Sequence, residues 1–173
     1  LIHQRWEYVD RSQVRYHHLW TMNPDGTNQM VYFGNMHPST VMIDAKPIPG
    51  TNKVCSLFSP GHGQKEHAGR VTIIDPSTGP DNQDAAVAIS NELYRDPYPL
   101  SEDLFIVARN GDFGLLRGDG SYQAIWSIPD DWKTDSLWVH EPRPIRARER
   151  EQVIPDRVDP SMPTGQVLLD NVY

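Results

Sequence analysis

The chain has 173 residues, 38% of them hydrophobic, and a net charge of -7, so it is long enough for one domain with a buried core. No stretch approaches the roughly 18 apolar residues of a membrane-spanning helix, so we expect no membrane insertion, and the acidic balance argues against a nucleic-acid partner. Fifteen prolines and twelve glycines predict many turns and few long helices.

The first predicted hairpin lies between residues 18 and 33. Residues 18–22 and 29–33 are rich in aromatic and β-branched side chains, and residues 23–26 (Asn-Pro-Asp-Gly) match a type I turn between them. Residues 6–10 alternate apolar and polar side chains, which predicts a further strand before the hairpin.

The same pattern returns twice along the chain. Further strands are predicted at residues 53–58, 69–74, 103–107, 113–117 and 122–126. The turn aspartates of the three units, Asp25, Asp75 and Asp119, are 50 and 44 residues apart. A period of about 40–50 residues with several strands per repeat is typical of propeller blades.

The sequence therefore predicts an all-β fold, a β-propeller fragment of about three four-stranded blades that is truncated at both ends. A single blade cannot bury both of its faces, so neighbouring blades must stack. Three units do not close a ring, and we expect the remaining blades and a following domain of a parent protein as partners. A β-sandwich built from the same hairpins is the alternative fold.

The pattern also predicts domain boundaries. The partial propeller covers residues 1–141, with blades at about 1–40, 41–92 and 93–130 and the start of a further strand up to 141. An extended Pro/Arg-rich linker covers residues 142–164, and residues 165–173 begin the first strand of another domain. The arginines of the linker are expected to dock on the acidic propeller surface through forked hydrogen bonds.

Three aspartates are candidate ligand-binding residues at the mouth of the propeller channel. Residues 44–50 and 96–101 open the second and third units alike, with prolines that suit the end of an innermost strand. Asp10, Asp44 and Asp96 lie near the predicted inner strand ends. In propellers this position faces the channel mouth, where ligands bind.

The candidate metal ligands are Cys55, His62 and His67. Thiolate and imidazole groups suit zinc or copper, but spacings of seven and five residues match no compact zinc-binding motif. The alternative is a buried cysteine on a strand beside two solvated loop histidines.

Two other groups of polar residues have simpler interpretations. Asp25, Asp75 and Asp119 could bind calcium, but their loops lack the dense acidic spacing of a calcium site, which favours capping of their own turns. His17 and His18 are neighbours on a predicted strand, so we expect one to be packed and the other exposed.

Several segments resemble the propeller region of hydrazine synthase alpha-subunit-like proteins, a family known especially from planctomycetes. The resemblance is carried first by residues 5–11 (RWEYVDR), 19–21 (LWT) and 24–27 (PDGT). It continues through residues 45–50, 61–69, 97–103, 142–148 and 170–173. TolB-like propellers share the Asp-Gly turns but not the first of these segments.

The resemblance implies a non-catalytic scaffold or binding segment within a larger protein of the periplasm or another exported location, with other subunits as further partners. No signal peptide is recognisable in the chain. In the family, c-type haems lie outside the propeller, and such a haem needs a C-x-x-C-H motif. Cys55 is the one cysteine, so we expect no covalently attached haem here. The alternatives are a segment of a multihaem redox enzyme and a TolB-like periplasmic peptide-binding propeller.

Overall fold

The computed structural model describes residues 2–6, 16–60, 68–135, 137–147, 150, 153 and 159–165. Within them the chain is all-β, as predicted, and its helical turns are short 3₁₀ segments. The first seven strands are β1 (Ile2–Trp6), β2 (Tyr16–Thr21), β3 (Met30–Phe33), β4 (Thr40–Pro47), β5 (Val54–Ser59), β6 (Arg70–Ile74) and β7 (Ala86–Ala88). The last four are β8 (Arg95–Ser101), β9 (Leu104–Ala108), β10 (Asp112–Arg117) and β11 (Tyr122–Ser127). The 3₁₀ segments are η2 (Pro76–Thr78), η3 (Gln83–Ala85) and η4 (Asp130–Asp135).

The first seven strands form one curled sheet, ordered β1-β2-β4-β5-β6-β7 with β3 paired to β2. Strands β4 to β7 follow one another as an antiparallel meander. The N-terminal strands join this meander through a short parallel pairing of Tyr16 with Thr40 and of His17 with Val41. The first two predicted units are therefore continuous in one sheet, because the start of β2 pairs with the start of β4.

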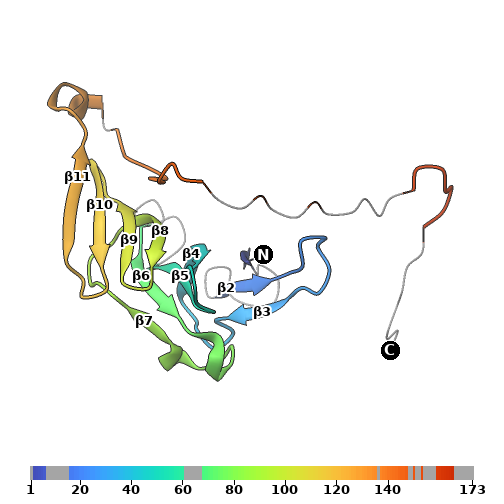
Figure 1. The fold of residues 1–173 in the computed structure, drawn as a ribbon. Helices are drawn as coiled ribbons and strands as arrows, with labels where there is room; N and C mark the ends of the chain where they lie inside the picture. The colour runs from blue at the N-terminus through green and yellow to red at the C-terminus, as the bar shows by residue number, and fades with distance from the viewer. Residues whose placement is uncertain are drawn as a thin grey trace.

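The last four strands form a second sheet, an antiparallel meander in the order β8-β9-β10-β11. The two sheets lie side by side, with residues 137–147 leaving the second sheet as an extended segment (Figure 1). Strand β8 contacts both β4 and β5. The first strand of the second meander thus lies against the first two strands of the other meander.

A hydrophobic core lies between the two sheets. It contains Leu57 and Val71 from the first sheet and Phe105, Val107 and Leu116 from the second, all between 0% and 2% exposed. β-branched and aromatic side chains suit strands that are buried on a packed face. A second cluster, which includes Leu19, Phe33 and Met42, packs the N-terminal strands on β4. Packing of sheet on sheet therefore holds the two meanders together.

The predicted turn-capping role of the aspartates is confirmed. In each turn the carboxylate accepts a hydrogen bond from the backbone N–H two residues further along the chain. The pairs are Asp25 with Thr27 (3.1 Å), Asp75 with Ser77 (3.0 Å) and Asp119 with Ser121 (2.9 Å). Asp159 caps a fourth turn in the same way, with Ser161 at 3.0 Å. The short side chain bonds to its own backbone and fixes the turn.

The histidine pair differs from expectation. His17 and His18 are both buried, at 0% and 1% exposure. Strand alternation still points them to opposite faces, but β2 is covered on both sides, so neither side chain reaches solvent. No helix of the described residues is long and apolar enough to cross a membrane.

Candidate functional site

The candidate site begins with three acidic residues whose backbones bend in the same way. Asp44 in β4, Asp96 in β8 and Glu141 in the extended segment have φ values of 57°, 51° and 49°. The β4–β5 pairing shifts register between Ile43 and Lys46, and the β8–β9 pairing shifts between Arg95 and Tyr98. Aspartate accepts a positive φ more readily than most residues. The chain therefore bends at the acidic residue in β4, in β8 and in the extended segment.

The bends bring the three carboxyl groups together. Asp44, Asp96 and Glu141 each place a carboxylate oxygen within 4.8 Å of the other two. We call these three residues the carboxylate cluster. The side chains of Asp44 and Asp96 are 22% and 18% exposed, whereas that of Glu141 is 49% exposed. Residues from both sheets and from the C-terminal segment therefore meet at one point.

Each member of the carboxylate cluster is held by a neighbour. Asp96 Oδ2 accepts a hydrogen bond from the Glu141 backbone N–H at 2.9 Å and lies 3.0 Å from His140 Nδ1. Lys46 pairs with Asp44. Arg143 Nε donates to Glu141 Oε2 at 3.0 Å. These contacts link the extended segment to β8 and spread basic groups around the acidic ones.

Burial raises the pKa of Asp44 above its ordinary value. The hydrogen bond and the charge of Lys46 oppose this rise, and the nearby Glu141 and Asp96 carboxylates add to it. An acid with a raised pKa takes up a proton more readily in the folded chain than in the unfolded chain. The stability of the folded chain therefore falls as pH rises from the pKa of Asp44 in the unfolded chain to its higher pKa in the folded chain.

Asp44→Asn is expected to raise the thermal unfolding midpoint at pH 7, because it removes a charge that burial disfavours. The gain should shrink as pH falls below the ordinary pKa of aspartate, where Asp44 is protonated in both states. Thermal denaturation followed by circular dichroism at several pH values measures this.

Asp119→Asn is the matched control. Hydrogen bonds from Ser121 lower the pKa of Asp119, so its contribution is present at neutral pH and is lost as pH falls through the folded-state pKa. This variant should therefore lower the midpoint at pH 7. A midpoint that falls for Asp44→Asn as well would show that the Lys46 contact outweighs burial.

A groove of about 430 Å³ opens beside the carboxylate cluster. Its cationic lining consists of Lys46, Arg143 and Arg146, and Tyr98 and three prolines form its walls. The Arg146 guanidinium lies 5.9 Å from the centre of the Tyr98 ring, a cation–π contact. Two of the three cations are engaged with the carboxylate cluster, so charges are largely matched within the chain at this point.

Of the three predicted channel-mouth residues, the structure brings Asp44 and Asp96 together, and Asp10 lies outside the described residues. Sequence reasoning missed Glu141, which was assigned only as the end of the last unit. A signal was present: residues 44–48, 96–100 and 141–145 share an acidic residue, then Pro three positions later and Ile or Leu after it.

The predicted metal ligands stay a prediction, because His62 and His67 lie outside the described residues. Cys55 is fully buried in the core between the two sheets. Burial raises the pKa of its thiol to about 12, which keeps it protonated at neutral pH, whereas a metal ligand must be a thiolate. The surroundings of Cys55 are those of a core residue.

The arginines of the linker were expected to dock on an acidic surface. Arg143 binds an acidic residue of its own segment, Glu141, and Arg146 lies over Tyr98 of the second sheet.

Comparison with known proteins adds no assignment to this geometry: no family model matches the chain, and no curated protein or solved structure was found to match it.

Proposed function

We propose that this chain is a β-propeller segment that acts as a non-catalytic scaffold and binding module within a larger protein. The observation that supports this proposal most strongly is the repeated geometry of the two meanders. Strands β4 to β7 and β8 to β11 each run in chain order, and the first strand of each bends at an aspartate with positive φ, Asp44 or Asp96. Successive blades of a propeller have this order, with the first strand innermost.

The packing between the meanders supports the same proposal. The core residues Leu57 and Val71 face Phe105 and Leu116 across the two sheets, as stacked blades require. The innermost strands β4 and β8 are in contact. Their acidic bends meet in the carboxylate cluster, where the axis of a propeller would lie.

Residues 137–147 fit the position of the next innermost strand. Glu141 repeats the acidic bend and contacts Asp96 of β8. Arg146 lies over the ring of Tyr98. Tyr98 pairs with Ile106, and Ile106 pairs with Leu115, so these residues share the side of the second sheet that faces away from the shared core. The extended segment thus lies against that side, where a following blade would stack.

That side of the second sheet, formed by Phe113, Leu115 and Trp126, we call the outer face. Phe113 pairs with Trp126, their ring centroids are 6.0 Å apart, and Trp126 is 42% exposed. Exposed apolar groups grouped on one sheet face mark an interaction surface. We propose that its natural occupant is the following blade, because the extended segment that leads to such a blade contacts the same sheet through Arg146 and Tyr98.

The chain alone is therefore expected to self-associate through the outer face. Trp126→Lys should shift the sedimentation velocity profile toward monomer, because it replaces an exposed apolar side chain of this surface with a charged one. Met36→Lys is the control, since Met36 is 58% exposed and lies elsewhere in the fold. A wild-type chain that sediments as a monomer at all concentrations, or equal effects of both variants, contradicts the proposal.

The resemblance to hydrazine synthase alpha-subunit-like proteins supplies the proposed setting, a larger exported protein whose haems would lie outside this chain. It is supported by the sequence of residues 5–11, 19–21 and 24–27. An absorption spectrum of the full-length protein tests the setting separately. A Soret band would support it, and a protein that folds without one would leave the scaffold role in another kind of parent.

A further inference from the structure

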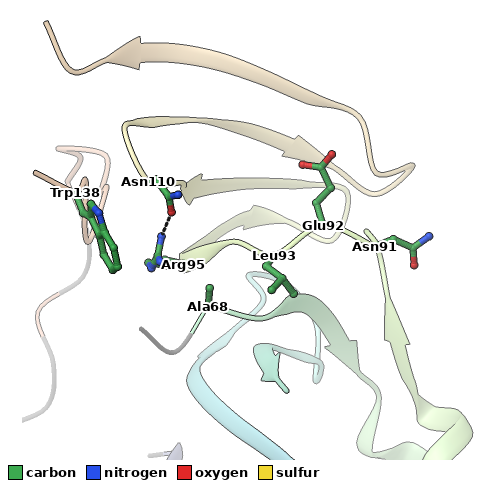
Figure 2. A pocket seen from close by; sticks show the side chains of 7 residues that line it. All are labelled: Ala68, Asn91, Glu92, Leu93, Arg95, Asn110 and Trp138. Atoms are coloured by element: carbon green, nitrogen blue, oxygen red, sulfur yellow. Dashed lines mark hydrogen bonds between the residues drawn. The ribbon is translucent and has the colours of Figure 1, made fainter. Parts of the chain in front are cut away.

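A cavity of about 600 Å³ at the start of β8 is separate from the groove beside the carboxylate cluster (Figure 2). The charged side chains that line it are engaged within the chain, because Arg95 donates a hydrogen bond to Asn110 at 2.7 Å and Glu92 pairs with Arg109 at 3.3 Å. A titratable side chain with an unsatisfied buried atom lies elsewhere, in the loop between β3 and β4. It is His37, whose Nε2 is buried and has no hydrogen-bond partner among the described residues.

The ring of His37 is partly buried and contacts two aromatic rings. Its centroid lies 5.4 Å from that of Phe33 at the end of β3 and 5.7 Å from that of Phe58 in β5. Phe33 belongs to the second hydrophobic cluster, and Phe58 packs against it. The ring also hydrogen-bonds to the backbone of Gln83 in η3. Because Nε2 has no partner, Nδ1 makes this bond and carries the proton of the neutral ring.

The loop that carries His37 is fastened to the β6–β7 connection. The Gly34 backbone N–H donates to the Pro80 carbonyl at 3.1 Å, and the Gln83 side-chain amide donates to the Met36 carbonyl. We call residues 34–39, together with these contacts, the latch. The latch joins the end of the N-terminal hairpin to a connection of the following meander.

A positive charge on His37 would meet no compensating group. The titratable or charged side chains on the elements around the latch are those of Tyr32 in β3, Cys55 in β5, Asp81 and Asp84 at η3, Arg70 in β6 and His18 in β2. Burial lowers the pKa of His37, its hydrogen bond to the Gln83 backbone opposes this, and no described charged side chain contributes. Burial raises the pKa of Tyr32 and of Cys55 to about 12, so both are neutral where histidine titrates. A proton at Nε2 would therefore bury a charged donor that faces no acceptor.

We propose that His37 makes the latch sensitive to pH: the neutral ring holds it closed, and protonation opens it. In the open loop the ring is solvated and titrates near its ordinary pKa of about 6.5, whereas the closed loop takes up the proton less readily. The closed form is therefore fully favoured above the ordinary pKa, and it loses favour as pH falls toward the lower pKa of the closed form. The pairing of β2 with β4 keeps the N-terminal strands in the fold when the latch opens. The latch needs only the contacts of this loop, whether or not the chain forms a propeller.

Hydrogen exchange of the Gly34 and His37 amides, measured by NMR and divided by the intrinsic rate at each pH, tests the proposal. Both amides are bonded in the closed loop, that of Gly34 to Pro80 and that of His37 to the Gly34 carbonyl at 3.0 Å. Their protection should fall at least about threefold between about pH 7.5 and about pH 5. The Arg117 amide, bonded to Ser121 at 2.9 Å in the β10–β11 hairpin, should keep its protection. Equal protection of the latch at both pH values, or an equal fall at Arg117, overturns the proposal.

Two variants connect the effect to His37. His37→Phe keeps an aromatic ring beside Phe33 and Phe58 but cannot titrate, so protection of the Gly34 amide should no longer depend on pH. His37→Gln serves the same purpose if the phenylalanine variant does not fold. His140→Gln is the matched control, because the side chain of His140 is 49% exposed and contacts Asp96 at the carboxylate cluster, and it should leave the pH dependence intact. A pH dependence that persists without His37, or that is lost in His140→Gln as well, rejects the latch.

Discussion

Phe105→Ala should lower the free energy of unfolding by about 3–5 kcal/mol, the usual effect of removing a buried phenylalanine. Phe105 lies in β9, is fully buried, and packs in the core that both sheets share. The truncation leaves a cavity between the sheets that strands held by ladder hydrogen bonds cannot close. Because domains are stable by about 5–15 kcal/mol, this loss removes much of the stability that holds the sheets together.

Urea denaturation followed by circular dichroism measures the loss. Phe105→Leu keeps most of the volume and should lose less than about 1.5 kcal/mol, so it stays measurable if the alanine variant does not fold. Met36→Ala, at a 58% exposed position, should change stability by less than about 0.5 kcal/mol. A small effect of Phe105→Ala would mean that the two sheets do not share a core in solution.

Gly114→Ala should destabilise the chain by about 1–3 kcal/mol or more, the range for overpacking a close contact. Gly114 lies at a register shift between β10 and β11. A Cβ atom built there would lie 2.1 Å from the backbone oxygen of Gln123 and 2.8 Å from the Cα of Ala124. These are backbone atoms of the paired strand, so β11 has to move away for the methyl group to fit.

Gly111→Ala is the matched control three residues earlier, because a Cβ atom there meets nothing within 4 Å. It should change stability by less than about 0.5 kcal/mol. Thermal unfolding compares the two variants, and hydrogen exchange of β11 amides shows where the structure loosens. Equal midpoints for both variants would contradict the close approach of β10 and β11.

Sequence reasoning predicted the strands with strong local patterns. The aromatic and β-branched segments around Phe33, Leu57, Val71 and Phe105 lie in strands as expected, because alternating apolar residues favour a half-buried strand. The turn aspartates were also predicted correctly, since Asp followed by Gly or Pro is a local signal of a turn. Architecture beyond all-β depends on contacts between distant segments, which no local pattern encodes.

Other features were missed as well. β7 is three residues long and carries two alanines and one valine, so its pattern is too short to recognise. The burial of both His17 and His18 follows from what covers β2 and not from their own alternation. Arg95 was not singled out in the sequence, and its burial beside Trp138 of the extended segment depends on residues distant in the chain.

The candidate site shows the same division between local and distant signals. Asp44 and Asp96 were chosen from their place before apolar strands, and they do meet. Glu141 was assigned only as the last residue before a Pro/Arg-rich linker, although it repeats the acidic residue of the earlier units and the Pro followed by Ile or Leu. Aligning the units on their acidic bends, and not on their turn aspartates, would have found it.

The most direct measurement is an experimental structure of the full-length protein that contains this chain. The proposal predicts that β4, β8 and residues 139–146 run as successive innermost strands around one axis, with Asp44, Asp96 and Glu141 facing it. It also predicts that a further blade covers Phe113 and Trp126. A structure in which residues 139–146 pair with no following strands and the two sheets close into a sandwich would contradict the propeller assignment.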